Sequence, residues 1–189
     1  ARRALRRVTA SDGPSTVRHI DRNRARNAAN VDDVKRLIVP GNGDNIVPLA
    51  GMPFDHARNM ACEQTLSGGF DWLFFLDDDV ITPPDAILRL IAHNKPIVSG
   101  VYYRRSPPIG LPVMLRDVGP DGVNGRQYIE QYKIPDLIEA DHVGAGCLLI
   151  HRTVLEKLPP LSPRCHWFDW RVDRVDLPPN HRLSEDYTF

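Results

Sequence analysis

Apolar and polar positions alternate along this chain in blocks that predict strands and helices in turn. The strongest block is the apolar run Trp72 to Leu76, whose length and aromatic content are typical of a buried strand. It leads directly into three consecutive carboxylates, Asp77, Asp78 and Asp79. Acids at one strand end repel one another, so such a cluster normally lies against a cation. The acidic strand end is therefore the first candidate site.

Further apolar runs predict strands on either side of this one. Val34–Pro40 is expected to be the first strand, and Ile97–Tyr103 the strand that follows the acidic one. Ile46–Leu49 fits either a short strand or a loop packed on the sheet. Between residues 104 and 136, repeated prolines and glycines fit either short strands or a mobile loop. Regular patterning returns over Leu137–Ile150.

Three stretches with helical patterning separate the strands. The first, His56–Leu66, begins after Asp55, and the second, Pro83–His93, has Thr82 as its expected N-cap. Thr153–Leu158 is expected to be a short third helix. Alternation of strands and helices implies right-handed crossovers and a mainly parallel sheet with helices on its faces. We therefore expect an α/β fold, a three-layer α/β/α sandwich with a mainly parallel central sheet.

Length and composition are those of one ordinary soluble domain. The chain has 189 residues, 42% hydrophobic and 25% charged, and no apolar stretch approaches the roughly 20 residues of a membrane span. No signal peptide precedes the first expected element. Cys62, Cys147 and Cys165 lack metal-binding spacing and are expected to be buried thiols, their odd number favouring a reducing compartment. A cytoplasmic location follows, with a peripheral position at a membrane face as an alternative.

Positive charge is concentrated near the N-terminus. Residues 1–27 hold eight arginines and two acids, so with a net charge of zero the remainder carries about −6. We expect residues 1–33 to form a basic extension, partly disordered or a helical surface, before a catalytic domain at 34–189. Contact with nucleic acid or an anionic membrane is the alternative. Aromatic residues do not interleave the arginines, which makes nucleic acid the less favoured partner.

The acidic strand end has both a chemical and a structural interpretation. Dense hard oxygen ligands suit Mg²⁺ or Mn²⁺, and carboxylate-bound Mg²⁺ typically also holds substrate phosphates. Ligands of open α/β sheets collect at the carboxyl ends of strands. The alternative is an acidic turn that caps the next helix. Because Thr82 and Asp85 already supply that cap, we expect Asp77, Asp78 and Asp79 to be functional.

Other residues with chemical potential lie before and after this strand. Arg58 and Asn59 fall in the first turn of the expected helix, where backbone N–H groups favour an anion, although both could face solvent. Gly144-Ala145-Gly146 permits close approach of a ligand or of another backbone segment. Trp167 and Trp170 fit either the core or a platform for stacking a sugar.

Taken in order, these pieces resemble the GT-A-fold nucleotide-sugar glycosyltransferases, particularly the inverting family 2 type. The shared features are Asp-x-Asp after a strand, a preceding helix with Ala-Arg-Asn, and Glu-Asp about a hundred residues further on. The resemblance covers roughly residues 36 to 189. The residues that carry it are Ala57-Arg58-Asn59, Phe75-Leu76-Asp77-Asp78-Asp79, the segment from Gly144 to Arg152, and Ser184-Glu185-Asp186.

The resemblance implies metal-dependent transfer of a sugar from a nucleotide-sugar donor to an acceptor hydroxyl, with inversion. Asp79, with Asp77, would bind Mn²⁺ or Mg²⁺, and Asp77 or Asp78 would face the ribose. A metal neutralises the charge that develops on a nucleoside diphosphate leaving group. Asp186, beside Glu185, would be the general base, because an acceptor hydroxyl needs a carboxylate to take its proton.

The same resemblance assigns the donor and acceptor contacts. Arg58 and Asn59 would lie near the nucleotide and Pro40 near its base. Gly144, Ala145 and Gly146 would border the donor sugar and leave room for it. Trp167 and Trp170 are tentative acceptor residues. The matching enzymes often add a metal-ligand histidine, for which His166 and His181 are candidates, and a C-terminally truncated domain or a degenerate enzyme stays open.

Three other classes share parts of this pattern. A haloacid-dehalogenase-like phosphatase also has Asp-x-Asp after a strand, but on the first strand of its domain and followed by Thr or Val, where this chain has Ile81. A sugar-phosphate nucleotidyltransferase needs a glycine-rich phosphate loop that residues 39–43 do not match. A non-catalytic carbohydrate- or nucleotide-binding module would keep the cleft without turnover, and would be indifferent to Asp186→Asn.

Overall fold

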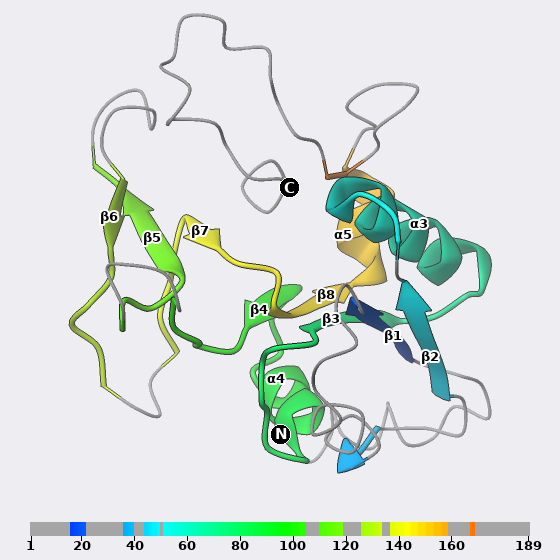
Figure 1. Ribbon diagram of the computed structural model, residues 1–189, viewed down its shortest axis with the longest axis horizontal. Helices are drawn as coiled ribbons and strands as arrows, with labels where there is room; N and C mark the ends of the chain where they lie inside the picture. The colour runs from blue at the N-terminus through cyan, green and yellow to red at the C-terminus, as the bar shows by residue number, and fades with distance from the viewer. Residues whose placement is uncertain are drawn as a thin grey trace, which may run out of the picture.

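The computed structural model of the chain describes residues 16–21, 36–39, 44–49, 51–104, 110–118, 126–133, 137–158 and 167–168. These residues form a five-stranded sheet and a separate three-stranded sheet (Figure 1). The larger sheet contains, in spatial order, β2 (Asp44–Leu49), β1 (Thr16–Asp21), β3 (Trp72–Asp77), β8 (Cys147–His151) and β4 (Ile97–Ser99). The smaller sheet contains β6 (Arg126–Tyr128), β5 (Met114–Asp117) and β7 (His142–Val143).

The expected three-layer sandwich with a mainly parallel sheet is wrong. β1 pairs in parallel with β2 and β3, but β8 runs antiparallel between β3 and β4, so the described larger sheet is mixed. The smaller sheet is antiparallel throughout its described pairings. Alternation of strand and helix patterns did not reveal strand direction, because the long connection before β8 contains a small sheet in place of a crossover helix.

β3 lies at the centre of the larger sheet and divides the core into two clusters. Leu73 and Phe75 pack with the helix α3 (Phe54–Ser67), whereas Phe74 and Leu76 pack with α4 (Ala86–Ala92). Figure 1 shows α3 and α5 (Arg152–Lys157) on one side of the sheet and α4 on the other. All four of these β3 side chains are at most 2% exposed, which confirms the prediction of a buried strand.

The first strand of the sheet lies where the sequence was interpreted as a basic extension. β1 occupies Thr16–Asp21, inside the segment assigned to residues 1–33. The predicted strand Val34–Pro40 is wrong over its described part, because Arg36 is helical and residues 37–39 have no regular structure. The apolar character of that run instead places Leu37 in the α4 cluster, 6% exposed. The high arginine content of this segment led us to interpret it as an extension, although Val17 and Ile20 are apolar residues of a strand.

The helices follow the predictions except at the start of α4. α3 begins two residues before the predicted His56, and α5 begins one residue before the predicted Thr153. The predicted N-cap Thr82 is wrong, since α4 begins after Asp85. Pro84 disfavours a helical conformation of the residue before it, so the Pro-Pro pair delays the helix. None of the described helices combines the length and apolarity needed to cross a bilayer.

The region between residues 104 and 136 contains short strands, as one of the two interpretations expected. β4 ends at Ser99, not at the predicted Tyr103, because the backbone then leaves the larger sheet. Tyr103 forms a bridge with Pro112, and the carbonyl of Tyr102 accepts a hydrogen bond from Val113 N at 2.9 Å. This short ladder joins the end of β4 to the smaller sheet.

Two of the three cysteines are confirmed as buried thiols. Cys62 and Cys147 are free and buried, and Cys165 lies outside the described residues. Burial is the main cause that raises the pKa of both thiols, in the case of Cys147 to about 11. Each stays protonated at neutral pH, which suits a role in packing because the thiolate is the reactive form.

His151, the last residue of β8, is expected to make folding sensitive to mild acid. Its Nδ1 accepts a hydrogen bond from Thr153 N at 3.3 Å in the first turn of α5, and its ring packs edge-on against Trp72. Burial lowers the pKa of His151 from its ordinary 6.5, against the opposing charges of Asp71 and Glu156. Protonation therefore favours the unfolded chain, so the stabilisation is complete above 6.5 and is lost progressively below it.

Urea unfolding at about pH 7.5 and about pH 5.5 checks this, since histidine titrates in that range. The wild-type midpoint should fall at the lower pH. In His151→Asn, whose side chain still accepts a capping hydrogen bond, that fall should become smaller. The same pH dependence in both proteins would assign the acid sensitivity to other groups.

Candidate functional site

The candidate site lies where the carboxyl ends of β1, β2 and β3 meet, and we call this end of the larger sheet the acidic edge. The parallel register places Asp21 opposite Asp77 and also opposite Leu49, so three strand ends meet there. After Asp77 the chain turns, and Val80 N donates to the Asp77 carbonyl at 3.1 Å. Asp77, Asp78 and Asp79 are all partly exposed, unlike the fully buried residues that precede them in β3. The fold thus leaves this acidic edge accessible.

Arg58 reaches this edge from α3. Its Nη2 lies 3.7 Å from Oδ1 of Asp77, and the Arg58 side chain is 5% exposed whereas that of Asp77 is 33% exposed. The guanidinium also lies about 6 Å from the ring centroids of Phe54, Phe75 and Phe168. Burying a cation among aromatic rings is costly unless charge partners compensate it. The rings of Phe54, Phe75 and Phe168, which we call the aromatic shell, therefore hold the Arg58 guanidinium next to the Asp77 carboxylate.

Gly146 packs against the same carboxylate and Gly144 against Tyr102, and the space beside both glycines is already filled. A Cβ on Gly146 would lie 3.0 Å from Oδ2 of Asp77 and 2.9 Å from the Tyr102 hydroxyl. A Cβ on Gly144 would overlap the Tyr102 hydroxyl and crowd Val113. Gly146 N donates to the Tyr102 hydroxyl at 2.9 Å, and Asp77 N donates to the Gly146 carbonyl at 3.0 Å. The room expected for a donor sugar beside these glycines is occupied by Tyr102.

Asn59, predicted to lie near a nucleotide, instead holds a distant segment of the chain. It is 7% exposed, and its Oδ1 accepts hydrogen bonds from Trp167 N at 2.8 Å and Phe168 N at 3.0 Å. Its Nδ2 donates to the Phe168 carbonyl at 2.7 Å. These contacts seat Phe168 against Phe75 and Arg58. Asn59 therefore supports the candidate site from behind, through the aromatic shell of Arg58.

Trp167 belongs to the core, the first of the two interpretations considered for it. The residue is 9% exposed, and its indole Nε1 donates to the Leu155 carbonyl at 3.2 Å. The ring is therefore packed in the core, and the acceptor role of Trp167 stays a prediction. The remaining predicted residues, Pro40, Trp170, Glu185, Asp186, His166 and His181, lie outside the described residues.

A metal at this edge would need ligands in addition to the side chains that the structure describes. In the part of the chain that the structure describes, no three His, Cys, Asp or Glu side chains are grouped to hold a metal ion. Mg²⁺ commonly uses one or two carboxylates and completes its shell with substrate phosphates and water. The partly exposed acids Asp77 and Asp79 fit that kind of site. They do not fit a closed cage made by the described residues alone.

Comparison with known proteins adds a likeness of fold. No family model matches the chain, and no curated protein matches it. The chain is similar in fold to A197 from STIV. A crystal structure of A197 matches with a TM-score of 0.54 and 20% sequence identity, over 76% of this chain and 68% of A197. At this identity the likeness to A197 concerns the fold alone.

The sequence alone did not identify two residues of the site, Tyr102 and Asp21. Tyr102 contacts the glycines, and its signal was present as a pair of tyrosines at the end of the run Ile97–Tyr103. Asp21 lies opposite Asp77 in the register, as an acid at the end of a strand. That strand was hidden by its arginine and histidine, which interrupt the apolar pattern.

Proposed function

We propose that the protein is a metal-dependent glycosyltransferase that moves a sugar from a nucleotide-sugar donor to an acceptor hydroxyl. The observation that carries the proposal is the buried Arg58 guanidinium 3.7 Å from Asp77 at the edge where three parallel strands end. Gly146 backs the same carboxylate. Three motifs that carry the resemblance thus meet at one place, although 88 residues of sequence separate Arg58 from Gly146.

The residues at this edge would divide the work of binding the donor. Asp79 and Asp77 would hold Mn²⁺ or Mg²⁺, which when bound neutralises charge on the diphosphate leaving group. Arg58 fixes the position of the Asp77 carboxylate and adds positive charge beside the metal site. Tyr102, hydrogen-bonded to Gly146 N, closes the glycine side of the edge. Each of these roles depends on side-chain positions held by packing.

The transfer itself exchanges one bond to the anomeric carbon for another. The acceptor oxygen forms a bond to that carbon while the bond to the diphosphate oxygen breaks. The nucleoside diphosphate leaves with the electron pair, and the proton of the acceptor hydroxyl passes to a carboxylate base. Asp186 is the predicted base and lies outside the described residues. Inversion stays an expectation from the resemblance.

The ion pair alone would also fit a structural role, and the position of the pair is what supports a functional one. A buried ion pair is weak evidence for stability, because apolar residues of similar volume often serve as well. Here the cation is buried but its carboxylate partner is one-third exposed at a strand end. This arrangement keeps the carboxylate accessible beside two further acids. This favours a ligand at the edge.

A thermal-shift panel of nucleoside diphosphates and nucleotide sugars, each with and without Mn²⁺, tests the proposal. Ligand at a hundredfold excess over Kd stabilises the native state by about 2.7 kcal/mol, so binding of a donor should be visible. We expect a Mn²⁺-dependent shift with one nucleotide class. The matched control is Asp71→Asn, which removes a charge at the opposite end of β3 and should shift like wild type. No shift with any compound would reject the proposed function.

A further inference from the structure

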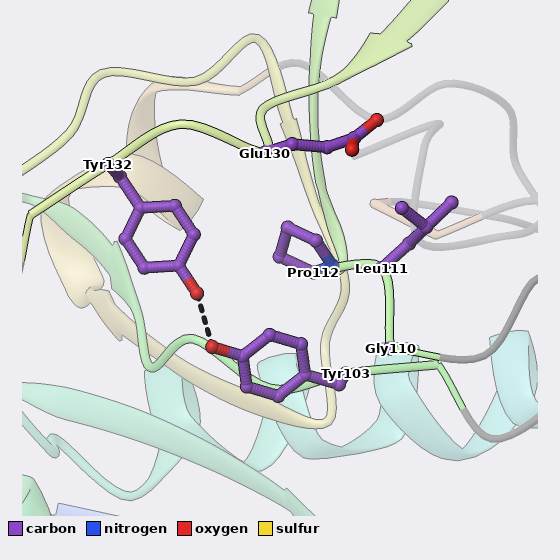
Figure 2. A pocket seen from close by; sticks show the side chains of 6 residues that line it. All are labelled: Tyr103, Gly110, Leu111, Pro112, Glu130 and Tyr132. Atoms are coloured by element: carbon purple, nitrogen blue, oxygen red, sulfur yellow. Dashed lines mark hydrogen bonds between the residues drawn. The ribbon is translucent and has the colours of Figure 1, made fainter.

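A concave region, distinct from the acidic edge, lies between the smaller sheet and the ladder at Tyr103. It has a volume of about 410 Å³, within the usual range for pockets that take small molecules. We call it the tyrosine hollow. Its lining residues come from three segments and are Tyr103, Gly110, Leu111, Pro112, Glu130 and Tyr132 (Figure 2).

Two tyrosines shape this hollow. The hydroxyls of Tyr103 and Tyr132 hydrogen-bond to each other, although the residues are 29 apart in sequence. Figure 2 shows the two rings converging at their hydroxyls, with Pro112 behind them. Tyr103 is 50% exposed, so its ring is available to a ligand. The hydrogen bond holds both rings in place before any ligand arrives.

One extended backbone segment separates the hollow from the acidic edge. Tyr102 and Tyr103 are consecutive in an extended segment that pairs with residues 111–113. Successive side chains of extended backbone point to opposite sides. Tyr102 accordingly contacts Gly144 and Gly146 at the acidic edge, whereas Tyr103 lines the hollow. The two sites therefore lie on the two sides of the same segment.

The lining disfavours an anion and offers stacking faces and hydrogen-bonding groups that suit a ligand rich in hydroxyl groups. The six residues include two aromatic rings, two tyrosine hydroxyls and the carboxylate of Glu130, and none is cationic. Arg104, close in sequence, is directed to Tyr128, to whose hydroxyl its Nη1 donates at 2.7 Å. A phosphate would thus meet a negative charge and no lining cation. A sugar ring would place its C–H face on a tyrosine and its hydroxyls on Glu130.

We propose that the tyrosine hollow binds a pyranose ring of a carbohydrate acceptor. Binding of the sugar stands on the hollow alone, whereas its role as acceptor rests on the proposed glycosyltransferase function. A hydroxyl of the bound carbohydrate would supply the oxygen of the new glycosidic bond. The Tyr103 hydrogen bond is the main cause that raises the pKa of Tyr132 to about 12, so the Tyr132 hydroxyl keeps its proton at neutral pH.

The test uses methyl glycosides of glucose, galactose and mannose as probes, observed by saturation-transfer difference NMR. We expect at least one glycoside to receive saturation at its ring protons from the wild-type protein. Tyr132→Ala should weaken that binding by about tenfold or more, the scale of one lost packing contact of about 1.4 kcal/mol. Tyr132→Phe, which keeps the ring, should lose less.

The controls separate this proposal from failure to fold and from failure of the proposed function. Gln131→Ala changes an exposed residue beside the lining and should bind like wild type. Glu130→Gln, at another exposed position, should weaken binding and serves if Tyr132→Ala does not fold. Absence of saturation transfer to every glycoside, or equal loss in Gln131→Ala, would overturn the proposal. A Mn²⁺-dependent thermal shift with a donor, without binding of any glycoside, would overturn the acceptor proposal alone. Binding of a glycoside without a thermal shift for any donor would overturn the proposed glycosyltransferase function.

Discussion

Asp79→Ala is expected to abolish metal-dependent binding of the nucleotide while the protein stays folded. Asp79 follows β3 in a partly exposed turn, outside the apolar clusters that stabilise the strand. Removing a group that supports a metal ligand typically lowers metal affinity by about 10–100-fold. Asp79 is proposed to contact the metal directly, so we expect its removal to lower the affinity for nucleotide by about 100-fold or more. Isothermal titration of the nucleotide found in the thermal-shift panel, with Mn²⁺ present, measures this loss.

Asp71→Asn is the matched control for this experiment, since it removes one acid from the other end of the same strand. It should retain wild-type affinity, and both variants should unfold cooperatively in urea. Unchanged affinity in Asp79→Ala would remove this residue from the site. A loss of affinity that Asp71→Asn reproduced would mean that net charge, not the ligand geometry, governs binding.

Arg58→Met is expected to weaken both the fold and the binding of the nucleotide. The substitution keeps most of the buried volume but removes the cation that lies among three aromatic rings and beside Asp77. Removing one partner of a fully buried pair costs about 3–5 kcal/mol, and the one-third exposure of Asp77 should reduce this to about 2–3 kcal/mol. Urea unfolding measures the stability, and titration with Mn²⁺ and nucleotide measures the binding.

A double-mutant cycle with Asp77→Asn separates packing from charge at this pair. Contacting ionic residues usually show a coupling energy of about 0.5–3 kcal/mol, and we expect a value in the upper half of that range. Arg58→Lys should recover only part of the loss, because an ammonium group does not stack on the rings as a planar guanidinium does. A coupling energy near zero would show that Arg58 and Asp77 act independently, which would contradict the described site.

The sequence predicted those elements whose local pattern is strong. β3 was predicted because five consecutive apolar residues bury both faces of a central strand, and α3 because its apolar residues follow helical spacing. The direction of β8 could not be predicted. Its residues Cys147–Ile150 are a continuous apolar run like that of β3, and such a run is compatible with either direction. β1 was missed because Arg18, His19 and Asp21 interrupt its apolar pattern.

The candidate site divides in the same way. Arg58 lies in a predicted helix and Asp77 ends a predicted strand, whereas their meeting with Gly146 depends on the antiparallel direction of β8. The sequence did not reveal that Asn59 and Trp167 hydrogen-bond to the backbone. An amide or an indole offers the same polar atoms to a ligand and to the backbone, so residue type alone does not distinguish the two. The tyrosine hollow depends on contacts between residues 103 and 132, which no local pattern encodes. Long-range pairing therefore accounts for what the sequence concealed.

Release of nucleoside diphosphate from nucleotide sugars measures the proposed transfer reaction itself. The wild-type protein would be incubated with Mn²⁺, a panel of donors and the glycosides that bind the tyrosine hollow, with Asp79→Ala and Asp71→Asn measured beside it. We expect Mn²⁺-dependent release from one donor. A glycoside should increase this release, Asp71→Asn should retain it, and Asp79→Ala should lose it. Release that Asp79→Ala retains, or no release and no binding with any donor, would contradict a glycosyltransferase site at the end of β3.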